Sequence, residues 1–326
     1  MSAPAISASP GPSLTPSKAL SPGRFLRDTA LRLACGVTRQ ALRHAPGSQA
    51  KQRIWDGVVR PYLIWRTLEI EAKSAFGARF TGQFPDSIHG YMYFFGVWEP
   101  AITAFYRANL NPGDVVIDVG ANVGVHSLLA ASLVGATGRV HAVEASPWIH
   151  ARLRHNIRTN GYTQVQTYNL AATHAPDLVR VFLHDLSNLG GTTIIPSEAE
   201  RLGSPCEAEV QGLPLPQIIP MEELLAARLI KIDVEGAEWL VVQGMRSVLP
   251  QLRADCDILM ELNPAALEAL GGSLDSLLEI FGEAGFQPFE IANSYQVHDY
   301  ITPPPATLTP FTRRDFDLAD LVFRRP

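Results

Sequence analysis

The sequence is poor in the features that mark membrane-spanning and disulfide-bonded proteins. No apolar run approaches the roughly 18 residues that a membrane span requires, and the longest, around Tyr91–Trp98, ends after about eight to ten. Only three cysteines, Cys35, Cys206 and Cys256, occur in 326 residues. Their wide separation excludes a C-x-x-C pair, a zinc-binding spacing and a disulfide framework, and it is typical of proteins from the reducing cytoplasm.

Charge is also scarce, at 18% of residues, and the formal net charge is −5. Nucleic-acid-binding proteins are usually basic, so we expect no nucleic-acid partner. Hydrophobic residues make up 46% of the chain, which is enough for a substantial core. The length of 326 residues predicts one large domain with extensions.

The N-terminal part of the chain differs from the rest in charge. Residues 1–54 contain eight Lys or Arg and one acid, Asp28, which gives +7 against −12 for the remainder. Residues 1–22 hold five prolines among Ser and Ala, so we expect a disordered tail. No charged segment precedes an apolar one, which argues against a secretory signal; an Arg- and Ser-rich start leaves a mitochondrial transit peptide as a minor alternative.

A helix is predicted after this tail, because Ser21-Pro22 supplies an N-cap and an N1 proline. Apolar residues then recur at helical spacing, with five arginines around them: Leu26, Ala30, Leu33, Val37 and Ala41. We expect this helix to pack on the main domain, within a helical extension over residues 23–75. The alternative is a basic amphipathic helix, residues 23–45, that rests on an anionic membrane surface.

From Asp114 onward, short apolar runs alternate with helical segments. The predicted strands are 115–119, 138–144, 165–170, 229–234 and 258–261, and the first two are followed by predicted helices over 123–134 and 147–160. Strands that are apolar throughout and separated by helices indicate a parallel sheet covered on both faces. Ligands of such sheets bind at the carboxyl ends of the strands, so we expect the functional site there.

The first predicted strand ends in a glycine-rich turn, Asp118-Val119-Gly120-Ala121-Asn122-Val123-Gly124. Glycine lets the backbone turn sharply against a ligand, and Asn122 tolerates a positive φ. A dinucleotide fingerprint needs a small sixth residue, whereas Val125 stands there. The tighter spacing suits a cofactor with a ribose and an amino-acid carboxylate, although a plain strand-to-helix turn is the alternative. Glu144, at the end of the next strand, could accept hydrogen bonds from ribose hydroxyls.

The segment LIKIDVEGAE, residues 229–238, places charges on a buried strand. Alternation puts Lys231 and Asp233 on the same side, so they must meet each other, another ion or a ligand. The position of Asp233 at the carboxyl end favours a functional role, whereas a structural ion pair is equally expected for Lys231. Glu235 and Glu238 follow at the start of a helix, where capping is a strong alternative for both.

The strand at 258–261 brings further oxygen ligands to the same sheet edge. Glu261 and Asn263 could join Asp233 in holding Mg²⁺. Sequence spacing does not show that the three converge, so no metal site is predicted.

Together these motifs resemble the FkbM-type S-adenosylmethionine-dependent methyltransferases. The resemblance is carried by VIDVGANVG, HAVEAS, LIKIDVEGAE and ILMELNP, with flanking stretches at 86–88, 96–100, 156–161, 187–191 and 285–286. It implies the class I methyltransferase fold, an α/β, Rossmann-like, three-layer structure. In that fold a seven-stranded, mostly parallel sheet has an antiparallel last strand, for which residues 321–323 are the candidate.

The resemblance also implies roles for individual residues. Cofactor binding is implied for Asp118, Gly120, Ala121, Asn122, Gly124, Glu144, Ala145 and Ala171. Asp118 would anchor the loop, Glu144 would hold the ribose and Ala171 would lie near the adenine. The family's acid before its KIDVEG strand, usually in a Leu-Asp pair, is replaced here by Met221-Glu222.

We therefore predict an S-adenosylmethionine-dependent O-methyltransferase that acts on a hydroxyl of a sugar, glycan or related natural product. An alcohol acceptor must lose a proton, which calls for a general base. The candidates are Asp233, Glu235, Glu261 and His126. Lys231 would orient Asp233 or stabilise an oxyanion, and His298 is more readily explained as a structural residue.

The expected methyltransferase domain covers residues 76–326, with a core over 112–291. Residues 171–222 are expected to form an added hairpin and loop over the site, and Tyr91–Trp98 to form another wall. An NAD-dependent oxidoreductase and a non-catalytic cofactor-binding module are the alternatives. The expected partner is a small-molecule or glycan acceptor, in the cytoplasm or at the membrane periphery.

Overall fold

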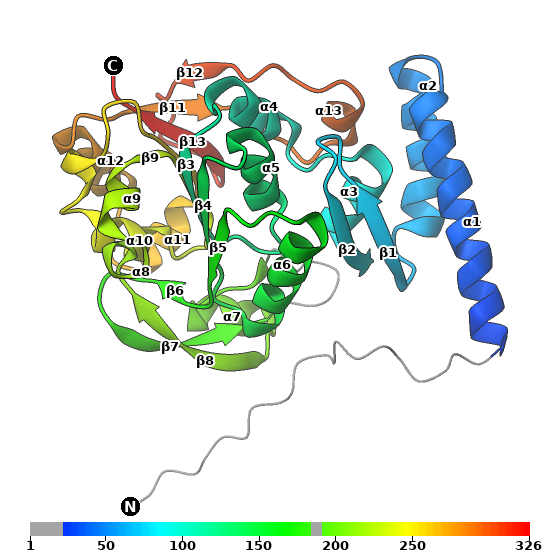
Figure 1. Cartoon of the computed structure of the whole chain (residues 1–326), viewed down its shortest axis with the longest axis horizontal. Helices are drawn as coiled ribbons and strands as arrows, with labels where there is room; N and C mark the ends of the chain where they lie inside the picture. The colour runs from blue at the N-terminus through cyan, green and yellow to red at the C-terminus, as the bar shows by residue number, and fades with distance from the viewer. Residues whose placement is uncertain (1–21, 184–190) are drawn as a thin grey trace, which may run out of the picture.

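The computed structural model describes residues 22–183 and 191–326. Its centre is an eight-stranded sheet with the order β12-β11-β13-β10-β9-β3-β4-β5, flanked by helices (Figure 1). The strands are β3 (Val115–Val119), β4 (Arg139–Val143), β5 (Val165–Tyr168), β9 (Ala227–Ile232), β10 (Asp257–Leu262), β11 (Gln287–Ile291), β12 (Leu308–Pro310) and β13 (Ala319–Arg324). The five from β10 to β5 are mutually parallel, which confirms the predicted parallel sheet.

The last strand, β13, is antiparallel to both of its neighbours, β10 and β11, as the class I fold requires. The expected seven strands are therefore present. The three-residue strand β12 extends the sheet by pairing with the outer edge of β11.

Helices cover the two faces of the sheet, and consecutive strand residues face opposite layers. Val116 packs in the layer of α4 (Pro100–Asn109) and α5 (Val125–Val134), whereas Ile117 packs in the layer of α10 (Glu238–Met245) and α12 (Leu274–Glu283). Burial on both faces is the reason that these strands are mainly apolar. The remaining helices after β3 are α6 (Pro147–Asn160), α7 (Pro196–Leu202), α8 (Leu215–Ile218), α9 (Met221–Leu225), η3 (Leu249–Gln251), α11 (Pro264–Ala269) and α13 (Val297–Ile301).

A second, small sheet lies between β5 and β9 in the chain. It has the order β6-β8-β7, from β6 (Ala171–Ala172), β7 (Asp177–Phe182) and β8 (Cys206–Leu213). The antiparallel pair β7 and β8 corresponds to the hairpin expected over 171–222. Residues 187–190 of the resemblance lie outside the described residues.

The N-terminal part packs beside this core (Figure 1). It comprises α1 (Pro22–His44), α2 (Gly47–Ile54), the π-helix η1 (Trp55–Leu63), β1 (Leu68–Lys73), β2 (Arg79–Phe84) and α3 (Ser87–Phe95). The helical extension expected over 23–75 therefore ends in a strand, because β1 pairs with β2 in an antiparallel hairpin. The tail expected over 1–22 lies outside the described residues, apart from Pro22 at the start of α1.

Helix α1 packs against α3, β1 and η1, as expected for a helix that packs on the rest of the chain. Its apolar stripe does not form the contact, because Leu33 and Val37 are 66% and 71% exposed. Cys35, Thr38 and Leu42 are buried instead. These residues also recur at helical spacing, and the small side chains of the first two let the helix lie close to its neighbours. Within the described residues, no helix is long and apolar enough to cross a bilayer.

Candidate active site

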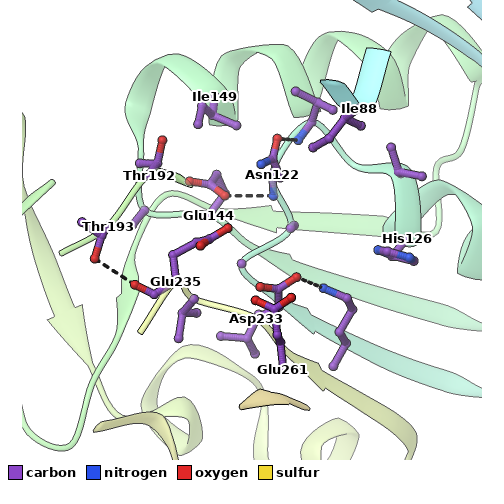
Figure 2. Close-up of a pocket in the computed structure, with 18 of the residues that line it drawn as sticks. Ile88, Asn122, His126, Glu144, Ile149, Thr192, Thr193, Asp233, Glu235 and Glu261 are labelled. Carbon is purple, nitrogen blue, oxygen red and sulfur yellow. Dashed lines mark hydrogen bonds and ion pairs between the residues drawn. The ribbon is translucent and has the colours of Figure 1, made fainter. Parts of the chain in front are cut away.

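A cavity of about 560 Å³ opens at the carboxyl ends of β3, β4, β9 and β10 (Figure 2). This is the sheet edge at which the sequence predicts the site, and its volume is in the range of small-molecule pockets. All five predicted catalytic candidates line it: Asp233, Lys231, Glu235, Glu261 and His126. Six of the eight predicted cofactor residues also line it: Gly120, Ala121, Asn122, Glu144, Ala145 and Ala171.

The floor of the cavity is the glycine loop between β3 and α5. At Gly120, with φ +83°, a Cβ atom would lie 1.7 Å from the carbonyl oxygen of Asp233. Only glycine therefore allows the end of β3 to pack against the segment that follows β9. Asn122 has the positive φ of 49° that its residue type tolerates.

Glu144 ties this loop to the end of β4. Its carboxylate accepts a hydrogen bond from the backbone N–H of Asn122 at 2.9 Å (Figure 2). It also accepts one from the backbone N–H of Ser146 at 2.8 Å. Burial raises the pKa of Glu144 to about 7, although these two hydrogen bonds oppose the rise. A carboxylate has about four acceptor positions, so it can accept further bonds from a ligand in the cavity.

Lys231 and Asp233 form an ion pair with each other, which is one of the three outcomes that their alternation on the strand left open. Lys231 Nζ lies 2.6 Å from Asp233 Oδ2 (Figure 2), and Lys231 is buried. Burial lowers the pKa of Lys231, but the carboxylates of Asp233 and Asp118 outweigh it, and the pKa is raised well above its usual value. Lys231 therefore stays charged and holds the Asp233 side chain in one position.

Asp118 and Gly124 lie beneath the cavity and do not line it. Asp118 Oδ2 accepts a hydrogen bond from Ser127 Oγ at 2.5 Å, which links β3 to α5 under the loop. At Gly124, with φ +93°, a Cβ atom would meet Leu153 of α6 at 2.6 Å. Both residues therefore shape the loop from below.

One wall of the cavity is rich in acidic side chains whose pKa is raised. Tyr295 Oη donates to Glu99 Oε1 at 3.0 Å or to Glu261 Oε1 at 3.2 Å. Burial is the first cause that raises the pKa of Glu99 to about 8 and that of Glu261 to about 10. Burial and the charge of Asp233 raise the pKa of Glu235 well above its usual value. Neutral pH therefore favours the protonated forms of Glu99 and Glu261.

His126 stands on the first turn of α5 and faces Glu99. Its Nε2 lies 3.3 Å from Glu99 Oε2. Burial, and then the charge of Lys231, lower the pKa of His126 well below its usual value, so the imidazole is neutral. His298, in contrast, is exposed and does not line the cavity.

Two polar side chains at the sheet edge accept hydrogen bonds from the backbone. Glu238 Oε1 accepts from the backbone N–H groups of Val234, at 2.9 Å, and Gly236, at 3.3 Å, both in the loop before α10. Glu238 therefore lies in the first turn of α10 but does not cap it, and the capping alternative is wrong for this residue. Asn263 Oδ1 caps α11 by accepting from the N–H of Ala266 at 3.2 Å. No group of metal-ligating side chains comes together in residues 22–183 and 191–326.

The Met221-Glu222 position, where the family usually has a Leu-Asp pair, lies outside the cavity. Glu222 is exposed on α9. Its neighbour Glu223 contacts the imidazole of His141 on β4 instead.

The sequence missed several residues of the cavity wall. Trp65, Glu99 and Tyr295 come from segments far from the glycine loop in the chain, and Thr193 Oγ1 donates to the carbonyl oxygen of Glu235 at 2.9 Å. Glu99 has a φ of 46° at the start of α4. The signal that could have found it was its place in the stretch 96–100, which is part of the family resemblance. The expected aromatic wall at Tyr91–Trp98 is present, through Tyr91 and Trp98.

Comparison with known families assigns the chain to a protein family. The model of the methyltransferase FkbM domain matches residues 118–288, which is more than half of the sequence and contains the glycine loop, Glu144 and the ion pair. The chain belongs to this family. The enzyme is a methyltransferase that uses S-adenosylmethionine, as predicted, and the oxidoreductase and non-catalytic alternatives are not supported.

Curated relatives match shorter segments. The chain is 30% identical over 108 residues to a protein-L-isoaspartate O-methyltransferase of Ignicoccus hospitalis, which covers 28% of this chain and 51% of the relative. It is 46% identical over 54 residues to the enzyme of the same name from Aeropyrum pernix, which covers 17% of this chain and 21% of the relative. The chain thus spans about half of the first relative's length and less of the second.

Among solved structures, the likeness is distant. A SAM-dependent O-methyltransferase from Thermotoga maritima is 13% identical, with a TM-score of 0.38 over 79% of this chain and 78% of that one. Aeropyrum pernix fibrillarin in complex with S-adenosyl-L-methionine is 12% identical, with a TM-score of 0.36 over 69% of this chain and 76% of that one.

The residues of the cavity fit the cofactor of the family. Gly120 has no side chain, so its backbone is open to a ligand at the floor of the cavity, where a Cβ atom would not fit. Glu144 presents a buried carboxylate beside it. These are the groups that S-adenosylmethionine requires: a close backbone approach and an acceptor for ribose hydroxyls.

Proposed function

We propose that the enzyme is an O-methyltransferase whose acceptor is a hydroxyl of a sugar, a glycan or a related natural product. The observation that carries the proposal is the surplus of acids on the cavity wall. Among the described residues that line the cavity, five are acidic, Glu99, Glu144, Asp233, Glu235 and Glu261, and Lys231 is the one lysine. Carboxyl groups accept hydrogen bonds from hydroxyl groups, so this wall suits an acceptor rich in O–H donors.

Aromatic rings complete the acceptor side of the cavity. The ring centroids of Trp98 and Tyr295 lie 5.4 Å apart, and those of Trp98 and Tyr91 5.8 Å apart. Trp65 lines the same cavity. Aromatic faces offer an apolar surface to the C–H face of a sugar ring, while the acids meet its hydroxyls.

The same wall disfavours a carboxylate acceptor. Two relatives are named for methyl transfer to L-isoaspartate, which carries a negative charge. In this cavity such a group would face Asp233 and Glu144, with Lys231 already paired at 2.6 Å. Like charges in a partly buried site repel each other, so we favour a neutral alcohol as the acceptor.

We assign the cofactor to the loop side of the cavity. S-adenosylmethionine supplies a methyl group that is already activated on a sulfonium. The backbone of Gly120, Ala121 and Asn122 would hold the methionine end, and Glu144 would accept hydrogen bonds from the ribose hydroxyls. Ala145 and Ala171 line the cavity beyond Glu144, with Ala171 beside the adenine. Asp118 and Gly124 support the loop from below.

We assign proton removal to Asp233. It is the acid of the wall that is paired with an ammonium group, Lys231, whereas burial and neighbouring carboxylates raise the pKa of Glu235 and of Glu261. Asp233 takes the proton of the acceptor hydroxyl, and Lys231 keeps its carboxylate in place. Glu235 and Glu261 hydrogen-bond the acceptor, and the neutral His126 is the alternative base.

The experiment that tests the proposal is transfer of a labelled methyl group to fractionated cell glycans and lipids, with an isoaspartyl peptide in parallel. We expect label in the glycan or lipid fractions that survives mild alkali, because ethers resist it. Label on the peptide that is released by mild alkali would show a methyl ester and would contradict the proposal.

Replacing Glu144 by glutamine should weaken the binding of S-adenosylmethionine by about 10- to 100-fold. Hydrogen bonds to a charged group contribute roughly 1.5–3 kcal/mol, and glutamine lacks the second acceptor oxygen. Titration calorimetry measures the affinity. Glu207→Gln is the matched control, because Glu207 accepts hydrogen bonds from Ser146 and Trp148 next to this site but does not line the cavity. An equal loss in both variants would argue against a direct role for Glu144.

The same carboxyl group predicts a pH dependence of cofactor affinity. Burial raises the pKa of Glu144 to about 7, and only the ionised form accepts freely from ribose hydroxyls. The dissociation constant should therefore fall roughly tenfold between about pH 6 and pH 8, and Glu144→Gln should remove this change. The contribution of Glu144 to the free energy of unfolding changes with pH in the opposite direction to its contribution to cofactor affinity. Because its pKa is raised on folding, that contribution is complete at acid pH and is lost as the pH rises through about 7.

A further inference from the structure

The outer face of α1 exposes large apolar side chains. Phe25, Leu26, Leu33 and Val37 are 60%, 68%, 66% and 71% exposed. Leu26, Leu33 and Val37 form one stripe, because residues seven and eleven positions apart return to nearly the same side of a helix. Of the eleven large hydrophobic side chains exposed in the two described ranges, seven lie between residues 25 and 65.

Positive charge surrounds this stripe. Residues 22–66 contain nine Lys or Arg and two acids, while the whole chain has a net charge of −5. Asp28 and Asp56, the two acids, already bond to Arg27 and Gln52. Arg32 and Arg43 are exposed and lie along one margin of the stripe, about 100–120° around the helix from its centre.

We propose that this face binds the surface of an anionic phospholipid membrane. The α1 stripe, defined as Leu26, Leu33 and Val37, enters the boundary between headgroups and acyl chains, and Arg32 and Arg43 contact the phosphates. A helix of 23 residues with one apolar and one basic side lies in the plane of such a surface. This inference stands independently of the acceptor proposed above.

The positive charge around the α1 stripe favours an anionic membrane, rather than a second copy of the chain, as the partner of this surface. An apolar stripe alone would suit either occupant. Two copies would bring together two basic segments, each with nine Lys or Arg and two acids, and these would repel each other. Anionic lipid headgroups complement them, and each basic residue near such a surface strengthens binding.

The test is sedimentation of the full chain with vesicles of equimolar phosphatidylcholine and phosphatidylglycerol, and with vesicles of phosphatidylcholine alone. We expect binding to the first only, weakened by salt. The double variant Leu33→Glu/Val37→Glu should bind at least tenfold more weakly, because two charges would enter the apolar boundary. The double variant Arg32→Gln/Arg43→Gln should lose about fivefold for each arginine.

Leu178→Glu is the matched control, since Leu178 on β7 is 64% exposed and lies outside α1. It should bind vesicles like the unaltered chain. All variants should bind S-adenosylmethionine with unchanged affinity, which separates this test from that of the catalytic function.

Any of three results would overturn the proposal. The first is that the unaltered chain does not bind anionic vesicles at low salt, and the second is that Leu178→Glu loses as much binding as Leu33→Glu/Val37→Glu. The third is that light scattering shows a dimer that the Leu33→Glu/Val37→Glu substitutions dissociate, which would make the stripe a contact between two copies.

Discussion

Replacing Asp233 by asparagine is expected to lower turnover by about 10²–10⁴-fold, the range that general-base catalysis supplies. Asparagine keeps the shape of the side chain but cannot take a proton. Asp233 lies 2.6 Å from Lys231 at the carboxyl end of β9 and faces the cavity, so the loss should appear in the transfer step. Rapid-quench measurement of one turnover with labelled cofactor measures that step directly.

Cofactor binding is the readout that distinguishes a base from a structural residue. The affinity of Asp233→Asn for S-adenosylmethionine should stay within a few-fold of the unaltered enzyme, because the assigned cofactor contacts come from the glycine loop and Glu144. Asp320→Asn is a suitable control for the loss of a nearby negative charge, since Asp320 lies at the same sheet edge but does not line the cavity. Unchanged turnover of Asp233→Asn with normal cofactor binding would make our assignment of the base wrong.

The second large effect is expected at Gly120. Alanine there would place a Cβ atom 1.7 Å from the carbonyl oxygen of Asp233, and a backbone atom cannot move aside without shifting the segment after β9. The φ of +83° adds about 1–2 kcal/mol of conformational strain, and overpacking adds roughly 1–3 kcal/mol. We expect Gly120→Ala to lower the melting temperature by several degrees and to abolish measurable cofactor binding.

Gly161→Ala separates steric conflict from backbone strain. Gly161 has a φ of +69° at the end of α6, and a Cβ atom there would meet nothing within 4 Å. This variant should show only the strain of about 1–2 kcal/mol, with cofactor affinity unchanged. Normal cofactor binding by Gly120→Ala would show that the loop does not depend on its packing against the segment after β9.

Regular elements of the core were predictable because their signals are local. The helix predicted over 147–160 has the bounds of α6, since Ser146 caps its start by accepting from Ile149 and Gly161 ends it in the left-handed region. The central strands were predictable because they are buried on both faces and are therefore mainly apolar, with few polar positions. The loop at Gly120 was predictable because a glycine directly follows a run of β-branched residues that is typical of a strand.

The N-terminal helix shows where a local pattern is insufficient. Its sequence carries two apolar stripes, one with Leu33 and Val37 and one with Cys35 and Leu42, and periodicity alone does not decide which is buried. The choice depends on close packing: Cys35 and Thr38 let α1 approach α3 and β1, and Arg39 lies 4.5 Å from the ring centroid of Tyr93 on α3. The more hydrophobic stripe is left exposed.

The sequence by itself determined the parallel sheet, the glycine loop and the placement of Lys231 and Asp233 on the same side of one strand, because each follows from neighbours within a few positions along the chain. Only the tertiary structure decided that these two side chains pair with each other, and only it decided the acceptor side of the cavity. Tyr295 meets Glu99 across 196 positions and Glu261 across 34, and no periodicity encodes such contacts. They arise because α4 begins, and β10 and β11 end, at the same edge of one sheet, where burial and mutual repulsion raise the pKa of Glu99 and Glu261.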